Sequence, residues 1–170
     1  MPFLGTMPPV SGQANLQASD SSPKMTVGAM LLYADSSGNV SLLRYAKADN
    51  ATVKQHLAVK HASNTAGFAV ITAATADEAV PGVFAGIAAG TIASNQYGWV
   101  YCGGYCPDAD FSTSVASADK LVLSTTAGEL RTRDFSATIT ATAAGGVCVA
   151  RARDSASDAT GSVDIYGVYL

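Results

Sequence analysis

The stretch Tyr97-Gly98-Trp99-Val100-Tyr101 contains the only tryptophan of the 170-residue chain and leads directly into Cys102-Gly103-Gly104. Aromatic and β-branched residues in such a run favour a β-strand. The apolar run 81–88 precedes it, and Asn95-Gln96 predicts a turn between the two strands. Aromatic side chains at alternate strand positions usually pack in a core or an interface. Tyr97, Trp99 and Tyr101 are therefore predicted core or oligomer-interface residues.

The same alternation of short apolar runs and turn residues extends outward from this stretch. Residues 26–46 and 120–133 each predict a β-hairpin, with turns at Asp35-Ser36-Ser37-Gly38-Asn39 and at Thr125-Thr126-Ala127-Gly128. Residues 135–142 alternate strictly between apolar and polar side chains, as a half-solvated strand does. Further strands are predicted at residues 52–61, 67–73, 83–88, 97–102, 147–153 and 163–169. About nine or ten short strands indicate an all-β chain, folded as a single β-sandwich or β-barrel-like domain.

Residues 1–25 differ from the rest because they hold four of the six prolines and show no steady periodicity. They predict an extended N-terminal arm, followed by a β-rich domain over residues 26–170. The apolar side chains of the arm suggest that it orders against a partner, with a loose terminus as the alternative. They are Phe3, Leu4, Met7 and Val10. The first residues lack the basic and long apolar regions of a secretory signal.

The charge balance bears on the choice of partner. A net charge of −3 and a pI near 5.1 argue against nucleic acid, which requires clustered Lys and Arg. Basic residues concentrate in one stretch, which is either a solvated sheet face or a docking face for an acidic protein surface: Arg44, Lys47, Lys54 and Lys60. The apolar run 80–93 is interrupted by Pro81 and three glycines and is shorter than the roughly 20 residues that span a bilayer. No membrane helix is predicted.

Residues suited to catalysis or metal binding are few. The chain has two glutamates and two histidines, and it lacks a nucleophile elbow, a phosphate-binding loop and a dinucleotide fingerprint. Residues 52–61 are predicted as one strand, which places His56 and His61 on opposite faces. Asp108-Ala109-Asp110 lacks the glycine and glutamate of a calcium loop and predicts an ordinary turn. We therefore expect no catalytic residue, no metal site, no cofactor and no enzyme activity; a hydrolase using the histidines is a weaker hypothesis.

Three cysteines, Cys102, Cys106 and Cys148, make an odd count that fits no complete disulfide framework. Free thiols, a Cys102–Cys106 bridge across a turn and a metal ligand pair all stay open. Free thiols are the default and favour assembly in a reducing cytoplasm.

Four segments, taken in order, resemble the small capsid-associated proteins of tailed bacteriophages, which are decoration (cement) proteins and related head-fibre bases. They are Pro81-Gly-Val-Phe-Ala-Gly-Ile-Ala88, Tyr97-Gly-Trp-Val-Tyr-Cys-Gly-Gly104, residues 118–130 and residues 143–151. The resemblance implies a β-rich domain on the outside of an icosahedral shell and no enzyme activity. Cys102-Gly103-Gly104-Tyr105-Cys106 departs from the family pattern.

The resemblance also implies a function: binding the outer surface of an assembled phage capsid and stabilising the shell. The expected partners are the major capsid protein and further copies of the chain, as a trimer rather than a dimer, on the virion and in the host cytoplasm during assembly. The candidate capsid contacts are Phe3, Leu4, Met7, Val10, Arg44, Lys54 and Lys60. The alternative is a glycan- or host-binding, lectin-like module of a head fibre, with Tyr97, Trp99, Tyr101 and Tyr105 as an aromatic platform.

Overall fold

A computed structural model describes residues 16–61, 70–73, 84–124, 126–132, 148–157 and 159–166. Strands make up nearly all of the regular structure in these ranges, and the all-β prediction is confirmed. They are β1 (Met30–Ala34), β2 (Val40–Ala48), β3 (Ala58–His61), β4 (Val70–Ala73), β5 (Phe84–Ala88), β6 (Tyr97–Asp110), β7 (Lys120–Leu123), β8 (Leu130–Thr132), β9 (Ala150–Ala152) and β10 (Thr160–Ile165). The predicted strand at residues 135–142 lies outside the described residues.

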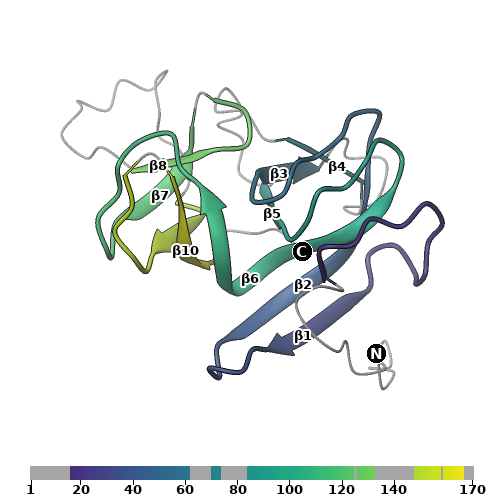
Figure 1. Cartoon of the computed structure of the whole chain (residues 1–170), viewed down its shortest axis with the longest axis horizontal. Coiled ribbons are helices and arrows are strands. Elements are labelled where there is room, and N and C mark those ends of the chain that lie inside the picture. Colours follow the sequence, from purple (N-terminus) through teal and green to yellow (C-terminus); the bar gives the residue numbers. More distant parts are fainter. Residues whose placement is uncertain are drawn as a thin grey trace.

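Five of these strands close into a small barrel. Strand β2 pairs with β4, β4 with β3, β3 with β5, β5 with β6, and β6 returns to β2. Only the β2–β4 pair in this ring is parallel. Closure leaves no free edge within the ring. The hairpin partner of β2, strand β1, extends the sheet outside the ring and forms its edge (Figure 1).

Small and β-branched side chains fill the barrel. Its buried cluster contains no residue larger than isoleucine: Ala46, Ala48, Val53, Val59, Ile71, Ala85, Ala88, Ile92 and Val100. A barrel of few strands has a narrow interior, so large side chains would not fit there. The abundance of alanine in the chain is explained in part by this requirement.

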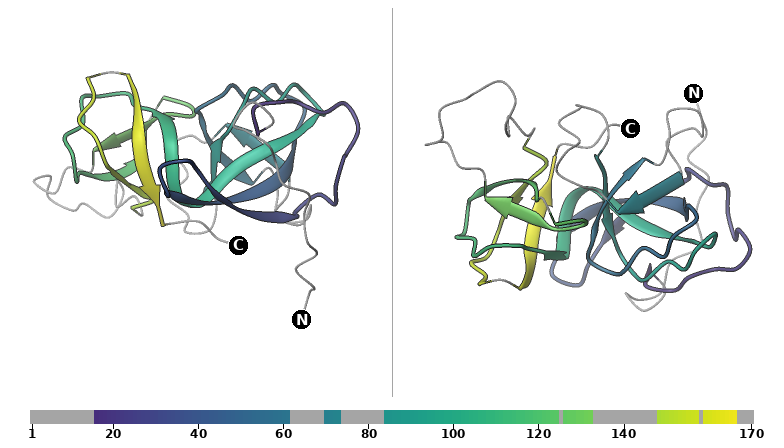
Figure 2. Two further views of the ribbon diagram at one scale, coloured as in Figure 1. Left: turned by 60° about the horizontal axis from the view of Figure 1, so that its bottom comes forward. Right: turned by 90° about the horizontal axis from the view of Figure 1, so that it is seen from above.

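Strand β6 carries the fold beyond the barrel. Its first half pairs with β2 and β5, and its second half pairs with β10. Strand β10 in turn pairs with β9, β9 with β7, and β7 with β8. Figure 1 shows β6 running between the barrel strands and the group that contains β7, β8 and β10, and both views of Figure 2 show the same division. A second, larger core lies on the other face of the barrel strands and continues into this group. It includes Tyr45, Trp99, Tyr101, Cys106, Phe111, Leu121 and Val163.

The prediction of one strand over residues 52–61 is wrong. Val53 forms an isolated bridge with Ile92, a turn follows in which His56 has a φ of 68°, and β3 begins only at Ala58. Ala58 and Val59 are both buried, because β3 lies between the barrel interior and the larger core. Alternation between apolar and polar residues cannot reveal a strand that is covered on both faces.

Part of the predicted arm lies on the domain. Leu16 is buried in the larger core, and Asp20 forms a two-way backbone bridge with Tyr97, with N···O distances of 2.8 and 2.9 Å. The Tyr45 hydroxyl donates a hydrogen bond of 2.8 Å to Asp20 Oδ2. The prediction that all of residues 1–25 stand apart from the core is therefore wrong for residues 16–25, whereas residues 1–15 lie outside the described part.

Removing the Tyr45 hydroxyl tests this attachment. In Tyr45→Phe the Asp20 Oδ2 atom loses this donor, whereas Oδ1 keeps its ion pair with Lys24, and we expect the free energy of unfolding to fall by about 1.5 kcal/mol. Cleavage by trypsin after the exposed Lys24 should become faster, because the segment opens more often. Tyr166→Phe, which removes a 3.0 Å bond to the Ala150 carbonyl oxygen, is the control and should leave the rate at Lys24 unchanged. Equal rates in both variants would contradict the role of Tyr45.

Gly86 marks the closest approach between two barrel strands. Its φ is +134°, and a Cβ placed there would lie 2.1 Å from the Tyr101 carbonyl oxygen. We expect Gly86→Ala to destabilise the fold by about 3 kcal/mol or more, measured by urea unfolding. Gly38→Ala is the matched control, since Gly38 also has positive φ, +81°, but no atom within 4 Å. That variant should lose only about 1 kcal/mol, so a similar loss in both would show that contact with Tyr101 does not matter.

Candidate functional site

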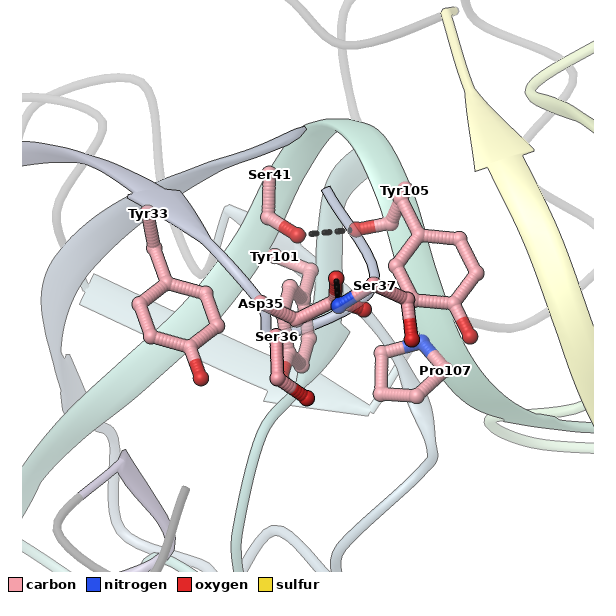
Figure 3. A pocket seen from close by; sticks show the side chains of 8 residues that line it. All are labelled: Tyr33, Asp35, Ser36, Ser37, Ser41, Tyr101, Tyr105 and Pro107. Atoms are coloured by element: carbon pink, nitrogen blue, oxygen red, sulfur yellow. Dashed lines mark hydrogen bonds between the residues drawn. The ribbon is translucent and has the colours of Figure 1, made fainter. Parts of the chain in front are cut away.

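A pocket of about 480 Å³ opens where the β1–β2 hairpin meets the bend in β6 (Figure 3). In Figure 3, Tyr33 stands on one side and Tyr105 with Pro107 on the other, with Asp35 and the turn serines between them. The lining residues are Tyr33, Asp35, Ser36, Ser37, Ser41, Tyr101, Tyr105 and Pro107.

The strand register explains why these side chains converge. Tyr33 pairs with Ser41, and Ser41 pairs with Gly104 across the neighbouring strand. Paired residues share a face of the sheet, so the hairpin presents Tyr33 and Ser41 toward β6. Gly104 has a φ of +68°, and a Cβ there would lie 2.5 Å from the Val40 carbonyl oxygen. This glycine allows β6 to bend against the hairpin, which brings Tyr105 and Pro107 to the opposite wall.

Asp35 organises the turn that forms the rim. Its Oδ1 accepts hydrogen bonds from the backbone N–H groups of Ser37 (2.8 Å) and Asn39 (2.9 Å), and its Oδ2 accepts one from Asn39 Nδ2 (2.9 Å). The Asn39 side chain, followed by backbone donors of the turn, lowers the pKa of Asp35. Ser36 and Ser37 are exposed at the tip of this fixed turn.

The wall formed by Tyr105 is held in place by contacts with Arg153 and Ser41. The guanidinium of Arg153 lies 4.9 Å from the centre of the Tyr105 ring, and Arg153 Nη1 donates a 2.9 Å bond to Asn39 Oδ1. Ser41 Oγ donates a 2.6 Å bond to the Tyr105 carbonyl oxygen. Burial raises the pKa of the Tyr105 hydroxyl, and burial also raises the pKa of Tyr101. Both hydroxyls therefore stay protonated near neutral pH and can donate as well as accept hydrogen bonds.

The chemistry of the lining is that of recognition. It offers three phenol rings, three serine hydroxyls and one carboxylate, and it includes no histidine, cysteine, lysine or arginine. Such a set can form hydrogen bonds and ring contacts. Within the lining, no serine has a histidine neighbour that could activate it as a nucleophile.

The predicted aromatic residues lie mainly in the core. Trp99 and Tyr101 are buried and Tyr97 is half-buried. Tyr45 contacts Trp99 edge to face at 5.3 Å and stacks on Tyr97 at 6.1 Å between ring centres. An exposed platform built on Trp99 is therefore excluded, and Tyr101 alone among the three lines the pocket. The sequence predicts only a turn at residues 35–39, and its pattern does not identify Tyr33, Asp35 and Ser41 as residues that line a pocket.

The basic residues do not share one solvated face. Arg44 is only 6% exposed and belongs to β2, whereas Lys54 is exposed and Lys60 is half-buried. The prediction of Arg44 as a capsid contact is not supported by this burial. The arm candidates Phe3, Leu4, Met7 and Val10 lie outside the described residues.

The histidines are separated, as expected, but for a different reason. His61 is buried on β3, whereas His56 occupies the preceding turn, with its ring nitrogens 3.9 Å from carboxylate oxygens of Asp108 and Asp110. These two aspartates lie in β6, so the prediction of a turn at residues 108–110 is wrong. Within the described residues, no group of three or more His, Cys, Asp and Glu could hold a metal ion, and no helix has the length and apolarity to cross a membrane.

The three cysteines are free thiols, with Cys102 and Cys106 buried and Cys148 half-buried. Burial raises the pKa of Cys102 to about 11 and also raises that of Cys106. Only the thiolate reacts with alkylating agents, so at pH 8 Cys102 should react about a hundredfold more slowly than an ordinary thiol. We expect iodoacetamide and mass spectrometry to show rapid labelling of Cys148 alone. Labelling in urea should modify all three, and fast labelling of Cys106 in the native protein would contradict this structure.

The opposite face of the β1–β2 hairpin carries exposed apolar side chains. Met30, Leu32 and Val40 are 39%, 68% and 49% exposed, and the register places them on one face with Ala34, Leu42 and the buried Arg44. Strand β1 is at the edge of the sheet and contains no charged residue or proline. Edge strands usually carry such residues to prevent association. We call this exposed apolar group the outer hairpin face, and it is a candidate interaction surface.

Comparison with known proteins gives a fold relationship. No protein-family model matches the chain, and no curated protein matches it significantly in sequence. Among solved structures, the crystal structure of the head fiber gp8.5 N base in bacteriophage phi29 is similar. The TM-score is 0.50 with 14% sequence identity, and the match covers 75% of this chain and 96% of that one. The fold of this chain is thus similar to that of a phage head-fibre base.

Proposed function

We propose that the chain is a structural virion protein that binds the outer surface of an assembled bacteriophage capsid and stabilises the shell without catalysing a reaction. The observation that carries this proposal is the match to almost the whole of the head-fibre N base. The order of the sequence segments that resemble capsid-associated proteins supports it independently. At this low identity the similarity describes the fold, and the function is our inference.

The outer hairpin face is our candidate for attachment to the major capsid protein. Its three exposed side chains, Met30, Leu32 and Val40, would be shielded from water in the complex. The uncharged edge of β1 can also pair with an extended segment of the partner through backbone hydrogen bonds. The predicted contacts Phe3, Leu4, Met7, Val10, Lys54 and Lys60 remain part of the proposal, whereas Arg44 is too buried to contact a partner.

A homo-oligomer, a trimer rather than a dimer, remains part of the proposal. Several modest contacts act together when copies are linked, so that the whole assembly holds more tightly than one chain. Preferential binding to the closed shell would stabilise it relative to its dissociated subunits. The proposed location is the virion surface, after assembly in the host cytoplasm.

Capsid occupancy tests the outer hairpin face. Leu32→Asp places a charge in the apolar contact, and we expect it to reduce occupancy of purified capsids at least tenfold, measured by cosedimentation and electron cryo-microscopy. Leu32 is exposed, so the domain should keep its melting temperature. Tyr166→Asp is the matched control, since Tyr166 is 54% exposed outside this face. Unchanged occupancy of Leu32→Asp would exclude the face as the capsid contact.

Deletion of residues 1–15 tests the arm separately. The deletion should stop at residue 15 because Leu16 and Asp20 hold the chain to the domain. We expect weaker capsid binding with an unchanged fold. Equal occupancy for the full and shortened chains would remove the arm from the proposal.

A second candidate function is a glycan- or host-binding module of a head fibre. The specific observation in its favour is the polar, tyrosine-lined pocket. Binding of the isolated chain to a glycan array, without capsids, would test this function.

A further inference from the structure

We propose that the pocket between the β1–β2 hairpin and the bend of β6 binds a neutral saccharide, an inference that rests on the second candidate function and names its site and ligand class. The volume of about 480 Å³ falls within the roughly 300–1,000 Å³ of small-molecule sites. A terminal mono- or disaccharide unit of a surface glycan is the occupant to which the lining is suited.

Two tyrosine rings on opposite walls of the pocket can pack against a sugar. Tyr33 projects from β1 and Tyr105 from β6, and Figure 3 shows them on either side of the turn. A pyranose presents C–H groups on its faces, which pack on phenol rings, and hydroxyl groups around its edge. Tyrosine suits such a ligand because it combines an apolar ring with a polar tip.

The hydrogen-bonding groups of the lining match a polyol. Ser36 and Ser37 contribute hydroxyls at the exposed rim, and the buried Tyr101 and the half-buried Tyr105 contribute phenol groups. A hydroxyl both donates and accepts, as each hydroxyl of a sugar does. The lining hydroxyls can therefore pair with the hydroxyls of a sugar, which also act both as donors and as acceptors.

The charges favour a neutral ligand over an anionic one. The only charged lining residue is the Asp35 carboxylate, which repels phosphate, sulfate and carboxylate groups. The nearby Arg153 lies over the Tyr105 ring and binds Asn39, with Asp164 Oδ1 3.8 Å from its Nε. Its guanidinium is therefore engaged in supporting the wall.

The pocket is also organised before a ligand arrives. The Asp35 turn is fixed by its three hydrogen bonds from Ser37 and Asn39, and Ser41 Oγ is fixed to the backbone of Tyr105. A site whose walls are already ordered loses less conformational entropy on binding. Weak, millimolar binding of a single sugar unit is the expected strength, since Ser36 and Ser37 at the rim are exposed to solvent.

The experiment combines a glycan array with nuclear magnetic resonance on the isotope-labelled full chain. The probes are the methyl glycosides of glucose, galactose and N-acetylglucosamine, together with any glycan that binds on the array. Methyl phosphate and choline serve as anionic and cationic comparisons. We expect at least one neutral saccharide to shift the amide signals of Ser36, Ser37 and Tyr105 in a saturable way, and methyl phosphate to leave them in place.

Substitutions test whether the saccharide binds in this pocket. Tyr33→Ala should weaken saccharide binding about tenfold, Tyr33→Phe should keep much of the affinity, and Tyr166→Ala should bind like the unaltered chain. Glycan binding with signal shifts elsewhere would overturn the pocket while leaving the second candidate function intact. Silence of both the array and the probes would overturn both, and a response to choline alone would exclude the saccharide. If Tyr33→Ala fails to fold, the amide signals that shift in the unaltered chain still show whether the saccharide binds in the pocket.

Discussion

The fold depends on one backbone constraint, which is that the fourteen-residue strand β6 pairs with two groups of strands within one continuous sheet. Its first half closes the barrel by pairing with β2 and β5, and its second half pairs with β10 and so supports β9, β7 and β8. The side chains of β6 also enter both cores, because Val100 lies in the barrel cluster whereas Trp99, Tyr101 and Cys106 lie in the larger one. Loss of β6 would therefore remove a paired strand from both groups.

The bend in β6 determines where the pocket lies, and the hairpin turn determines which side chains of β1 line it. Because side chains alternate along β1, Tyr33 faces the pocket whereas Leu32 belongs to the outer hairpin face. A slip of one residue in the β1–β2 register would exchange these two faces. The hydrogen bonds of Asp35 to Ser37 and Asn39 oppose such a slip, so a turn residue fixes both candidate surfaces.

Sequence patterns identified the strands best where local chemistry decides the structure. The hairpins at residues 26–46 and 120–133 were predicted from turn residues between apolar runs, and both occur. The extension of β6 through Gly103 and Pro107 was not predictable from strand propensity, because its partners in β10 lie 50 to 61 residues later in the sequence. The pocket was missed for the same reason: Tyr33 and Tyr105 belong to separate runs that only the register and the Gly104 bend bring together.

The two proposed surfaces can be used at the same time by one small domain. A barrel filled with alanine and valine buries modest apolar area per residue, so its stability benefits from any partner that binds the folded state alone. Attachment through the outer hairpin face would leave the pocket on the opposite face of the same hairpin accessible, since Leu32 and Tyr33 point to opposite sides. A pocket with weak affinity would then become effective through repetition over many copies on a shell. On this argument a rigid two-faced hairpin serves attachment and recognition together, and neither surface requires the other to move.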